Sequence, residues 1–274
     1  MLELEFAEQT DLGQQRQNNE DSVGHVLPAT PAQVRDAGFL FALADGMGGH
    51  EHGEVASKLA VETMLTGFRK VPKGIMHASL LPKLVQEANS AVYEAGHAKK
   101  STGASMGTTL VACALRFDSA VISHVGDSRC YLFRNGNGSI LTRDHTMAAE
   151  QMRLGILTTA DSQTDPEAGG MSHMLTRSLG FDLFVAADTI TVNIIPGDIL
   201  LLCSDGLHGF VSDVDIERII NRNTSTDPGL EKAAAALVAA ANAAGGGDNI
   251  TVQLIRVVGV ERMGLYRGRP YRLL

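Results

Sequence analysis

The sequence lacks any block of basic residues, and its formal net charge is −8 over 274 residues. A protein that holds a nucleic-acid backbone needs a positive face, so nucleic acid is not expected as a partner. Long apolar runs are absent as well, because "AAAALVAAANAA" from Ala233 is too short and too rich in alanine to span a bilayer. The start, "MLELEFAEQTD", has neither the basic nor the apolar region of a signal peptide. We therefore expect no membrane association and a cytoplasmic location.

Cysteine is scarce. The three cysteines, Cys113, Cys130 and Cys203, are widely spaced, and each lies within an apolar, strand-like run. That placement is typical of reduced cysteines in the core of a cytosolic protein. Apolar residues make up 44% and charged residues 20% of the chain, which is the composition of an ordinary globular protein.

Segments with the pattern of β-strands make up much of the sequence. They are rich in β-branched residues and separated by short turns. The segments are "LELEF", "GFLFALA", "GTTLVACALR", "AVISHV", "RCYLFR", "DTITVNI", "DILLLC" and "NITVQLIRV". The Gly/Asn-rich stretch after "RCYLFR" predicts a hairpin turn.

Three segments are predicted to be helical: residues 78–92, where apolar residues recur at helical spacing, "GEVASKLAVETMLTGF", and the alanine-rich "EKAAAALVAAANAA". The helices come in pairs between groups of strands, which favours layered sheets covered by helices over a doubly wound parallel sheet. No linker or repeat divides the chain, so a single domain over residues 1–274 is expected. The weakly patterned "GILTTADSQTDPEAGGMS" from Gly155 indicates an exposed flap.

Four aspartates lie at the ends of strongly apolar strands. Asp45 follows "FLFALA", Asp127 lies between "AVISHV" and "RCYLF", Asp205 follows "DILLLCS", and Asp248 precedes "NITVQLI". Each one alone could be a turn residue, because Asp-Gly pairs are common in tight turns. If several of these strand ends meet at one edge of a sandwich, the carboxylates cluster, and like charges that close require a cation.

The residue types indicate which cation. The donors are oxygens, and no cysteines or histidines stand at zinc-finger spacing, so Mg²⁺ or Mn²⁺ is expected. The glycines in "DGMGG" after Asp45 would let a backbone carbonyl and water approach the ion. The same segment lacks the Gly-Lys-Ser/Thr ending of a phosphate-binding P-loop, which disfavours that alternative.

Arg16 stands four residues before Glu20 in "GQQRQNNEDS". Two interpretations remain open from the residues alone. The guanidinium could balance the charge of nearby carboxylates, or its planar fork could hold a phosphate beside the metal ions. An adjoining metal cluster favours the second interpretation.

Taken together, these segments resemble the metal-dependent protein phosphatases of the PP2C type, in their bacterial form. The matching stretches, in chain order, are "GQQRQNNEDS", "ALADGMGGHEHGEVAS", "GTTLVACAL", "HVGDSRCYLFRNG", "LTRDHT", "LTRSLG", "LLCSDGLHGFVSD" and "GGGDNITVQLI". The resemblance implies an α+β fold: a four-layer αββα sandwich of two antiparallel β-sheets flanked by helices, with a small flap near residues 155–173.

The resemblance also implies a binuclear Mn²⁺ or Mg²⁺ centre, with a weaker third ion in bacterial members. By position, Asp45 is expected to bridge the two core ions, and the Gly46 carbonyl to bind one of them. Asp205 and Asp248 would complete the other. Asp127, together with Asp205, would hold the third ion.

Four further residues take roles from the resemblance. Glu20 and Asp21 are expected to hold metal-bound waters, Arg16 to bind phosphate, and Asn249 to orient Asp248. The implied reaction is hydrolysis of phosphoserine and phosphothreonine in proteins by an activated water, without a covalent phosphoenzyme. The implied substrates are phosphoproteins made by a cognate Ser/Thr kinase, and a monomer is expected.

One departure from the family concerns the general acid. Animal relatives carry a histidine directly after the Asp-Gly pair, whereas this chain has Met47. His50, His52, His145 and His173 are candidate helpers, although a solvated or structural role is favoured for each of them.

Rival functions remain to be weighed. "VGDSR" echoes a serine esterase motif, but Ser128 enters another strand and not a helix. A cysteine-based phosphatase is disfavoured, because no cysteine is followed six residues later by arginine. A metal-binding scaffold without activity is the rival from another class. The tail "GLYRGRPYRLL" is interpreted as a packed or frayed terminus in preference to a docking segment.

Overall fold

A computed structural model describes residues 1–47, 52–72, 74–98, 106–157, 171, 174–224 and 229–261, and the backbone of 263–266 and 269–272. The described helices are α1 (Pro31–Asp36), α2 (His52–Arg69), α3 (His77–Ala98), α4 (Met147–Arg153), α7 (Asp205–His208), α8 (Asp213–Asn223) and α9 (Gly229–Ala243). The described strands are β1 (Glu3–Asp11), β2 (Asp21–Val26), β3 (Phe39–Met47), β4 (Gly107–Thr108), β5 (Leu110–Arg116), β6 (Ser119–Val125), β7 (Arg129–Arg134), β8 (Asn137–Ile140), β9 (Asp188–Asn193), β10 (Ile199–Cys203), β11 (Ile250–Gly259), β12 (Met263–Tyr266) and β13 (Arg269–Arg272).

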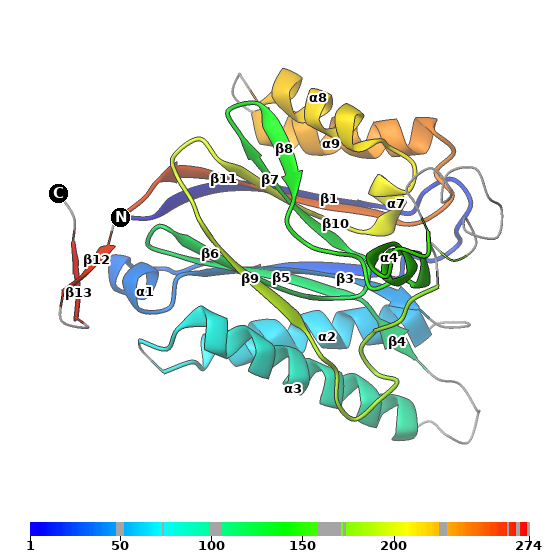
Figure 1. The fold of residues 1–274 in the computed structure, drawn as a ribbon, viewed down its shortest axis with the longest axis horizontal. Coiled ribbons are helices and arrows are strands. Elements are labelled where there is room, and N and C mark those ends of the chain that lie inside the picture. Colours follow the sequence, from blue (N-terminus) through cyan, green and yellow to red (C-terminus); the bar gives the residue numbers. More distant parts are fainter. Residues whose placement is uncertain are drawn as a thin grey trace.

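Two antiparallel sheets lie face to face (Figure 1). One has the strand order β1-β11-β10-β7-β8, and the other has the order β2-β3-β5-β6-β9, with β4 paired to β3. Helices α8 and α9 cover the first sheet, and α2 and α3 cover the second (Figure 1). The α+β sandwich of two antiparallel sheets flanked by helices is therefore confirmed. The flap expected near residues 155–173 falls for the most part outside the described residues.

The long apolar strands are buried on both faces, which explains why their sequences do not alternate with polar residues. In β3, Leu40, Ala42 and Ala44 face the α2–α3 layer. Phe41 and Leu43 face the opposite sheet. Two of these strands are central to their sheets: β3 lies between β2 and β5, and β10 lies between β11 and β7.

Local sequence explains the remaining elements near the site. In α2, buried Ala56, Ala60, Met64 and Phe68 recur every four residues and form the stripe that packs on β3. The predicted hairpin is confirmed as β7–β8, and its turn places Asn135 and Gly136 in the left-handed region, with φ of 51° and 83°.

The segment "GTTLVACALR" is not one strand, contrary to the prediction. It divides at Thr109 into β4 and β5. The backbone N–H of Thr109 donates to the carbonyl of Asp45 at 2.8 Å, and its hydroxyl accepts from the N–H of Asp45 at 2.9 Å. Thr109, at the break between β4 and β5, therefore holds the backbone of Asp45 near the end of β3.

The strand ends that carry the aspartates gather at one end of the sandwich. Helices α7 and α4 mark this end, opposite the N-terminus (Figure 1). Among the described residues, no helix is both long and apolar enough to cross a membrane.

Candidate metal centre

A pocket of about 390 Å³ lies at this end of the sandwich. Its lining brings together parts of the chain that are far apart in sequence, and the lining residues are Arg16, Glu20, Asp45, Gly46, Met47, Thr109, Asp127, Leu175, Asp205, Asp248 and Asn249. Every site residue predicted from the sequence except Asp21 lines this pocket. The structure thus brings the four strand-end aspartates together, which the turn interpretation of each does not require.

Asp45 is held by its backbone, which leaves its carboxylate free to face the pocket. Besides the two hydrogen bonds with Thr109, its carbonyl accepts from the Thr108 hydroxyl at 2.8 Å. The Thr109 hydroxyl is shared in turn with Ser128 Oγ at 2.7 Å. These two threonines were not predicted as site residues, and the only sequence signal for them is their place in the "GTTLVACAL" stretch.

Gly46 lies where the backbone of β3 meets the start of α2. A Cβ at this position would come within 2.1 Å of the Gly53 carbonyl oxygen, so a larger residue would force the two segments apart. Its N–H donates to the carbonyl of Glu20 at 3.0 Å. The crowding that requires glycine here comes from neighbouring backbone, a reason different from the one inferred from the sequence.

Asp21 lies directly opposite Asp45 in the β2–β3 register, behind the pocket. Its Oδ2 accepts a hydrogen bond from Ser204 Oγ at 2.8 Å, which ties β2 to the residue before Asp205. Its Oδ1 is buried and has no hydrogen-bond partner among the residues the structure describes. A buried carboxylate oxygen in that state is suited to a bound water or cation.

Two histidines hold the loop that carries Asp127. His208 Nε2 donates to the carbonyl of Asp127 at 3.0 Å, and the N–H of Gly126 donates to His145 Nδ1 at 3.1 Å. Burial lowers the pKa of both imidazoles to about 4, so both are neutral near pH 7. His145 therefore has the structural role favoured from the sequence. His208 was not anticipated, because only the fold brings it to Asp127.

Arg16 and Asp248 form an ion pair at the mouth of the pocket, with Nη2 and Oδ2 2.7 Å apart and half of the arginine side chain exposed. Beside them, the Asn249 amide makes three hydrogen bonds to the loop between β1 and β2. It donates to the carbonyls of Leu12 and Asn18 at 3.0 Å and accepts from the N–H of Glu20 at 2.8 Å. Asn249 thus fastens the loop that carries Arg16 to the start of β11.

The surroundings of the carboxylates at this pocket disfavour their ionised forms. Burial, and then the neighbouring carboxylates, raise the pKa of Asp21 to about 7 and that of Asp45 well above its ordinary value. The same two causes raise the pKa of Asp127 to about 7. Divalent cations would remove the mutual repulsion, and the donor set, all oxygen, is the one that Mg²⁺ and Mn²⁺ prefer. The residues present therefore fit such ions.

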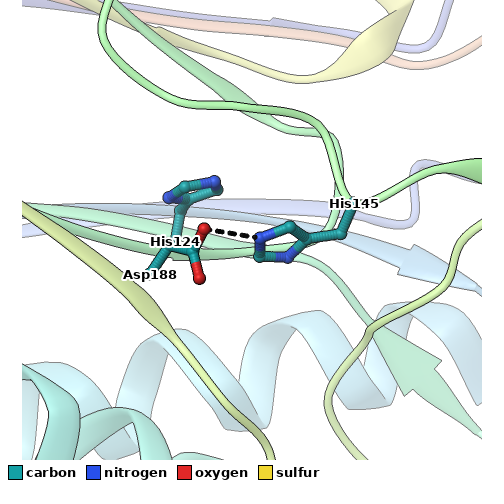
Figure 2. Close-up of side chains that lie close together, drawn as sticks. All are labelled: His124, His145 and Asp188. Atoms are coloured by element: carbon teal, nitrogen blue, oxygen red, sulfur yellow. Dashed lines mark ion pairs between the residues drawn. The ribbon is translucent and has the colours of Figure 1, made fainter. Parts of the chain in front are cut away.

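A second cluster of potential ligands, His124, His145 and Asp188, joins β6 to β9 and does not fit a metal ion. Figure 2 shows the His145 ring pointing at the Asp188 carboxylate. Because His145 Nδ1 accepts from Gly126, the proton of the neutral ring lies on Nε2, 3.4 Å from Asp188 Oδ2. That nitrogen has no lone pair for an ion, and Arg177 already supplies the positive charge at 2.9 Å from Asp188 Oδ1.

The serine and the cysteines considered as nucleophiles from the sequence are buried. Ser128 is buried and hydrogen-bonded to Thr109, so it does not face solvent as a serine nucleophile would. Cys113, Cys130 and Cys203 are free and buried, and burial raises the pKa of each thiol. His50 and His173 lie outside the described residues.

Known proteins are similar to this chain in both sequence and fold. The family model for protein phosphatase 2C matches residues 13–244. A "serine/threonine phosphatase stp" of Listeria innocua is 34% identical over 263 residues, which is 95% of this chain and 96% of the relative. The protein phosphatase PhpP of Streptococcus pneumoniae is 34% identical over 260 residues, covering 92% and 97%.

Solved structures extend the likeness to the fold. The serine/threonine phosphatase PstP/Ppp of Mycobacterium tuberculosis superposes with a TM-score of 0.80 at 32% identity, over 94% of this chain and all of that one. A PstP catalytic domain solved in complex with two manganese ions gives a TM-score of 0.77 at 34% identity, over 94% and 100%. Because the family model matches most of the chain, the chain belongs to the protein phosphatase 2C family and is a protein phosphatase of the bacterial form.

Proposed function

We propose that this phosphatase hydrolyses phosphoserine and phosphothreonine in proteins, with water activated by two divalent cations, Mn²⁺ or Mg²⁺. One observation carries the proposal: Asp45, Asp205 and Asp248, from three distant segments, line one pocket together with Arg16. The serine/threonine phosphatases of Listeria and Mycobacterium, and the manganese-bound relative, support the substrate class and the cation.

The ligands are proposed from the resemblance to the family and from the residues that line the pocket. Asp45, the Gly46 carbonyl, Asp205 and Asp248 would hold two cations, and Asp127 with Asp205 would hold a third. When bound, the cations would supply the positive charge that lowers the pKa of a water molecule and neutralises phosphate oxygens. Among the remaining residues, Glu20 and Asp21 would accept hydrogen bonds from water in the pocket and so orient it.

Arg16 would move from a carboxylate to the substrate. Its guanidinium lies 2.7 Å from Asp248 and is half exposed, so it is free to turn. With Asp248 bound to a cation, the planar fork of Arg16 would be able to donate hydrogen bonds to two oxygens of a phosphate at the mouth of the pocket. Arg16 would then hold the phosphate in place while water attacks from the opposite side.

The leaving oxygen would take its proton from water. Met47 lines the pocket at the position of the animal histidine, and a thioether has no proton to give. His145 is buried, with both ring nitrogens engaged by Gly126 and Asp188. A histidine at position 47 is therefore not expected to be required for turnover.

The wider context is proposed from the family. The substrates would be phosphoproteins, the targets of a cognate Ser/Thr kinase whose effect this enzyme reverses in the cytoplasm. The chain would act as a monomer, with residues 1–274 forming one phosphatase domain.

A comparison of two Asp→Asn variants tests the proposal. Asp205→Asn should lower kcat for p-nitrophenyl phosphate with Mn²⁺ by at least about 100-fold, because asparagine lacks the negative charge that would hold the cations. Asp118→Asn, at the opposite end of β6, should leave kcat within about twofold, the ordinary range for a surface change. Equal turnover of both variants would contradict the proposal, and metal binding with no turnover in the unmodified protein would favour the scaffold.

A further inference from the structure

A second pocket, of about 600 Å³, adjoins the carboxylate pocket. Met47 and Leu175 line both of them. On its far side lie Phe181, Phe184 and Val185, from the segment that leads into β9. A peptide chain whose phosphate enters the carboxylate pocket therefore passes beside an apolar hollow, within the reach of neighbouring side chains, since an extended chain advances only about 3.3 Å per residue.

The backbone of residues 180–186, which we call the platform, is fastened to α3 by two side-chain amides. Asn89, which is fully buried, accepts from the N–H of Gly180 at 2.9 Å and donates to the carbonyl of Asp182 at 2.9 Å. Gln86 donates to the carbonyl of Leu183 at 2.7 Å and accepts from the N–H of Val185 at 3.2 Å. Each amide uses both its donor and its acceptor, so the platform is held in one backbone conformation.

The platform nevertheless presents its large apolar side chains to solvent. Phe184 is 82% exposed, Leu183 62% and Phe181 48%. The Phe181 ring is seated on Gly107, where a Cβ would come within 2.2 Å of it. Exposed aromatic side chains on a fixed backbone are suited to binding, because little conformational freedom is lost when a partner covers them.

The charged residues that line the second pocket do not favour a charged ligand. Arg177 lies in its lining but is already paired with Asp188 at 2.9 Å. The other charged lining residue, Asp182, is of opposite sign and exposed. The remaining surface that the platform offers is apolar, so an uncharged, apolar side chain is the ligand that matches it.

We propose that the platform forms a specificity subsite that takes an apolar side chain, such as leucine, methionine or phenylalanine, flanking the phosphorylated residue of the substrate protein. This inference rests on the proposed function, because it assigns the occupant of a pocket next to the same catalytic centre. Phe184 is the residue that determines the preference, and Gln86 and Asn89 act as positioning residues for it.

The test uses short phosphothreonine peptides with alanine on both sides, in which each flanking position in turn carries phenylalanine. At one or more positions phenylalanine should raise kcat/KM by about tenfold, the effect of covering an aromatic side chain. Phe184→Ser should reduce that gain to less than about twofold, with hydrolysis of p-nitrophenyl phosphate unchanged. Val214→Ser, which alters an exposed apolar residue on α8, is the matched control and should keep the full gain.

The outcomes separate this inference from the proposed function. If the unmodified protein hydrolyses neither the phosphopeptides nor p-nitrophenyl phosphate, the proposed function is wrong. Normal turnover that does not depend on the flanking residue would overturn the subsite alone. If Phe184→Ser converts a dimer to a monomer in sedimentation while peptide selectivity stays the same, the platform binds a second copy of the chain, and the subsite is wrong. Unchanged hydrolysis of p-nitrophenyl phosphate by Phe184→Ser excludes misfolding as the cause of a lost gain, and Phe184→Leu, which keeps an apolar side chain, should keep part of the gain.

Discussion

Replacing Asp127 by asparagine should stabilise the metal-free protein at alkaline pH. Asp127 is buried beside other carboxylates, and these two causes raise its pKa from 3.8 to about 7. The folded state therefore binds a proton more tightly than the unfolded state does. The stability that this proton provides is present at low pH and is lost as the pH rises through about 7. Asparagine carries no charge and escapes this loss.

The size of the effect follows from the shift. A difference of about 3 pKa units corresponds to about 4 kcal/mol at pH 8, at about 1.4 kcal/mol per unit. Water entering the pocket and proton uptake by neighbouring carboxylates reduce this, so a gain of about 1–3 kcal/mol is expected. At about 2–4 °C per kcal/mol for a chain of this length, Tm should rise by about 2–12 °C.

The assay is calorimetric unfolding in EDTA across a pH series, with Asp118→Asn as the matched control. The advantage of Asp127→Asn should be largest at pH 8 and should decline as the pH is lowered toward 5. Added Mn²⁺ should raise Tm more in the unmodified protein than in the variant. An Asp127→Asn protein that is less stable than its parent at pH 8 without metal, or an equal gain in the control, would refute the reasoning.

Two other predictions concern single side chains. Asn249→Ala should lower the free energy of unfolding by about 2–4 kcal/mol, because three partly buried hydrogen bonds to the β1–β2 loop are lost. The same change should lower kcat. Denaturant unfolding measures the stability effect, and an unchanged midpoint would count against it. Burial lowers the pKa of His77 from 6.5 to about 4. The free energy of unfolding should therefore fall by up to about 3 kcal/mol as the pH falls from about 6.5 to about 4, because the unfolded state takes up the proton first. His77→Gln, which keeps a donor for the carbonyl of Ala37, should flatten that pH profile, and a profile that stays equally steep would argue against His77 as its source.

The parts of the fold that could be predicted are those in which the chain pattern and the packing agree. The run that ends on Asp45 predicted a buried strand, and β3 is buried because it faces a sheet on one side and helices on the other. Apolar spacing likewise predicted α3, alanine content predicted α9, and the segment of α2 was also predicted to be helical. Short elements such as α1, α4 and α7 were not predicted, because turn-length helices carry too little periodicity to be distinguished from loops.

The predicted site residues were found together in one pocket, apart from Asp21, which lies just behind it. What the sequence did not indicate are the contacts between distant segments. The hold of Thr109 on Asp45 depends on how β3 pairs with β4 and β5 within one sheet. The hold of His208 on Asp127 depends on where α7 lies beside the β6–β7 loop. The platform was missed for a similar reason, since Asn89 is a buried polar residue within an otherwise apolar helix stripe and its partners lie more than 90 residues further along the chain.

Anomalous diffraction at the manganese edge, from crystals grown with Mn²⁺, tests the central claim most directly, because it locates the ions without assuming their ligands. Two neighbouring peaks are expected among Asp45, the Gly46 carbonyl, Asp205 and Asp248. An enzyme that hydrolyses phosphopeptides but shows no anomalous peak in this pocket would contradict the account.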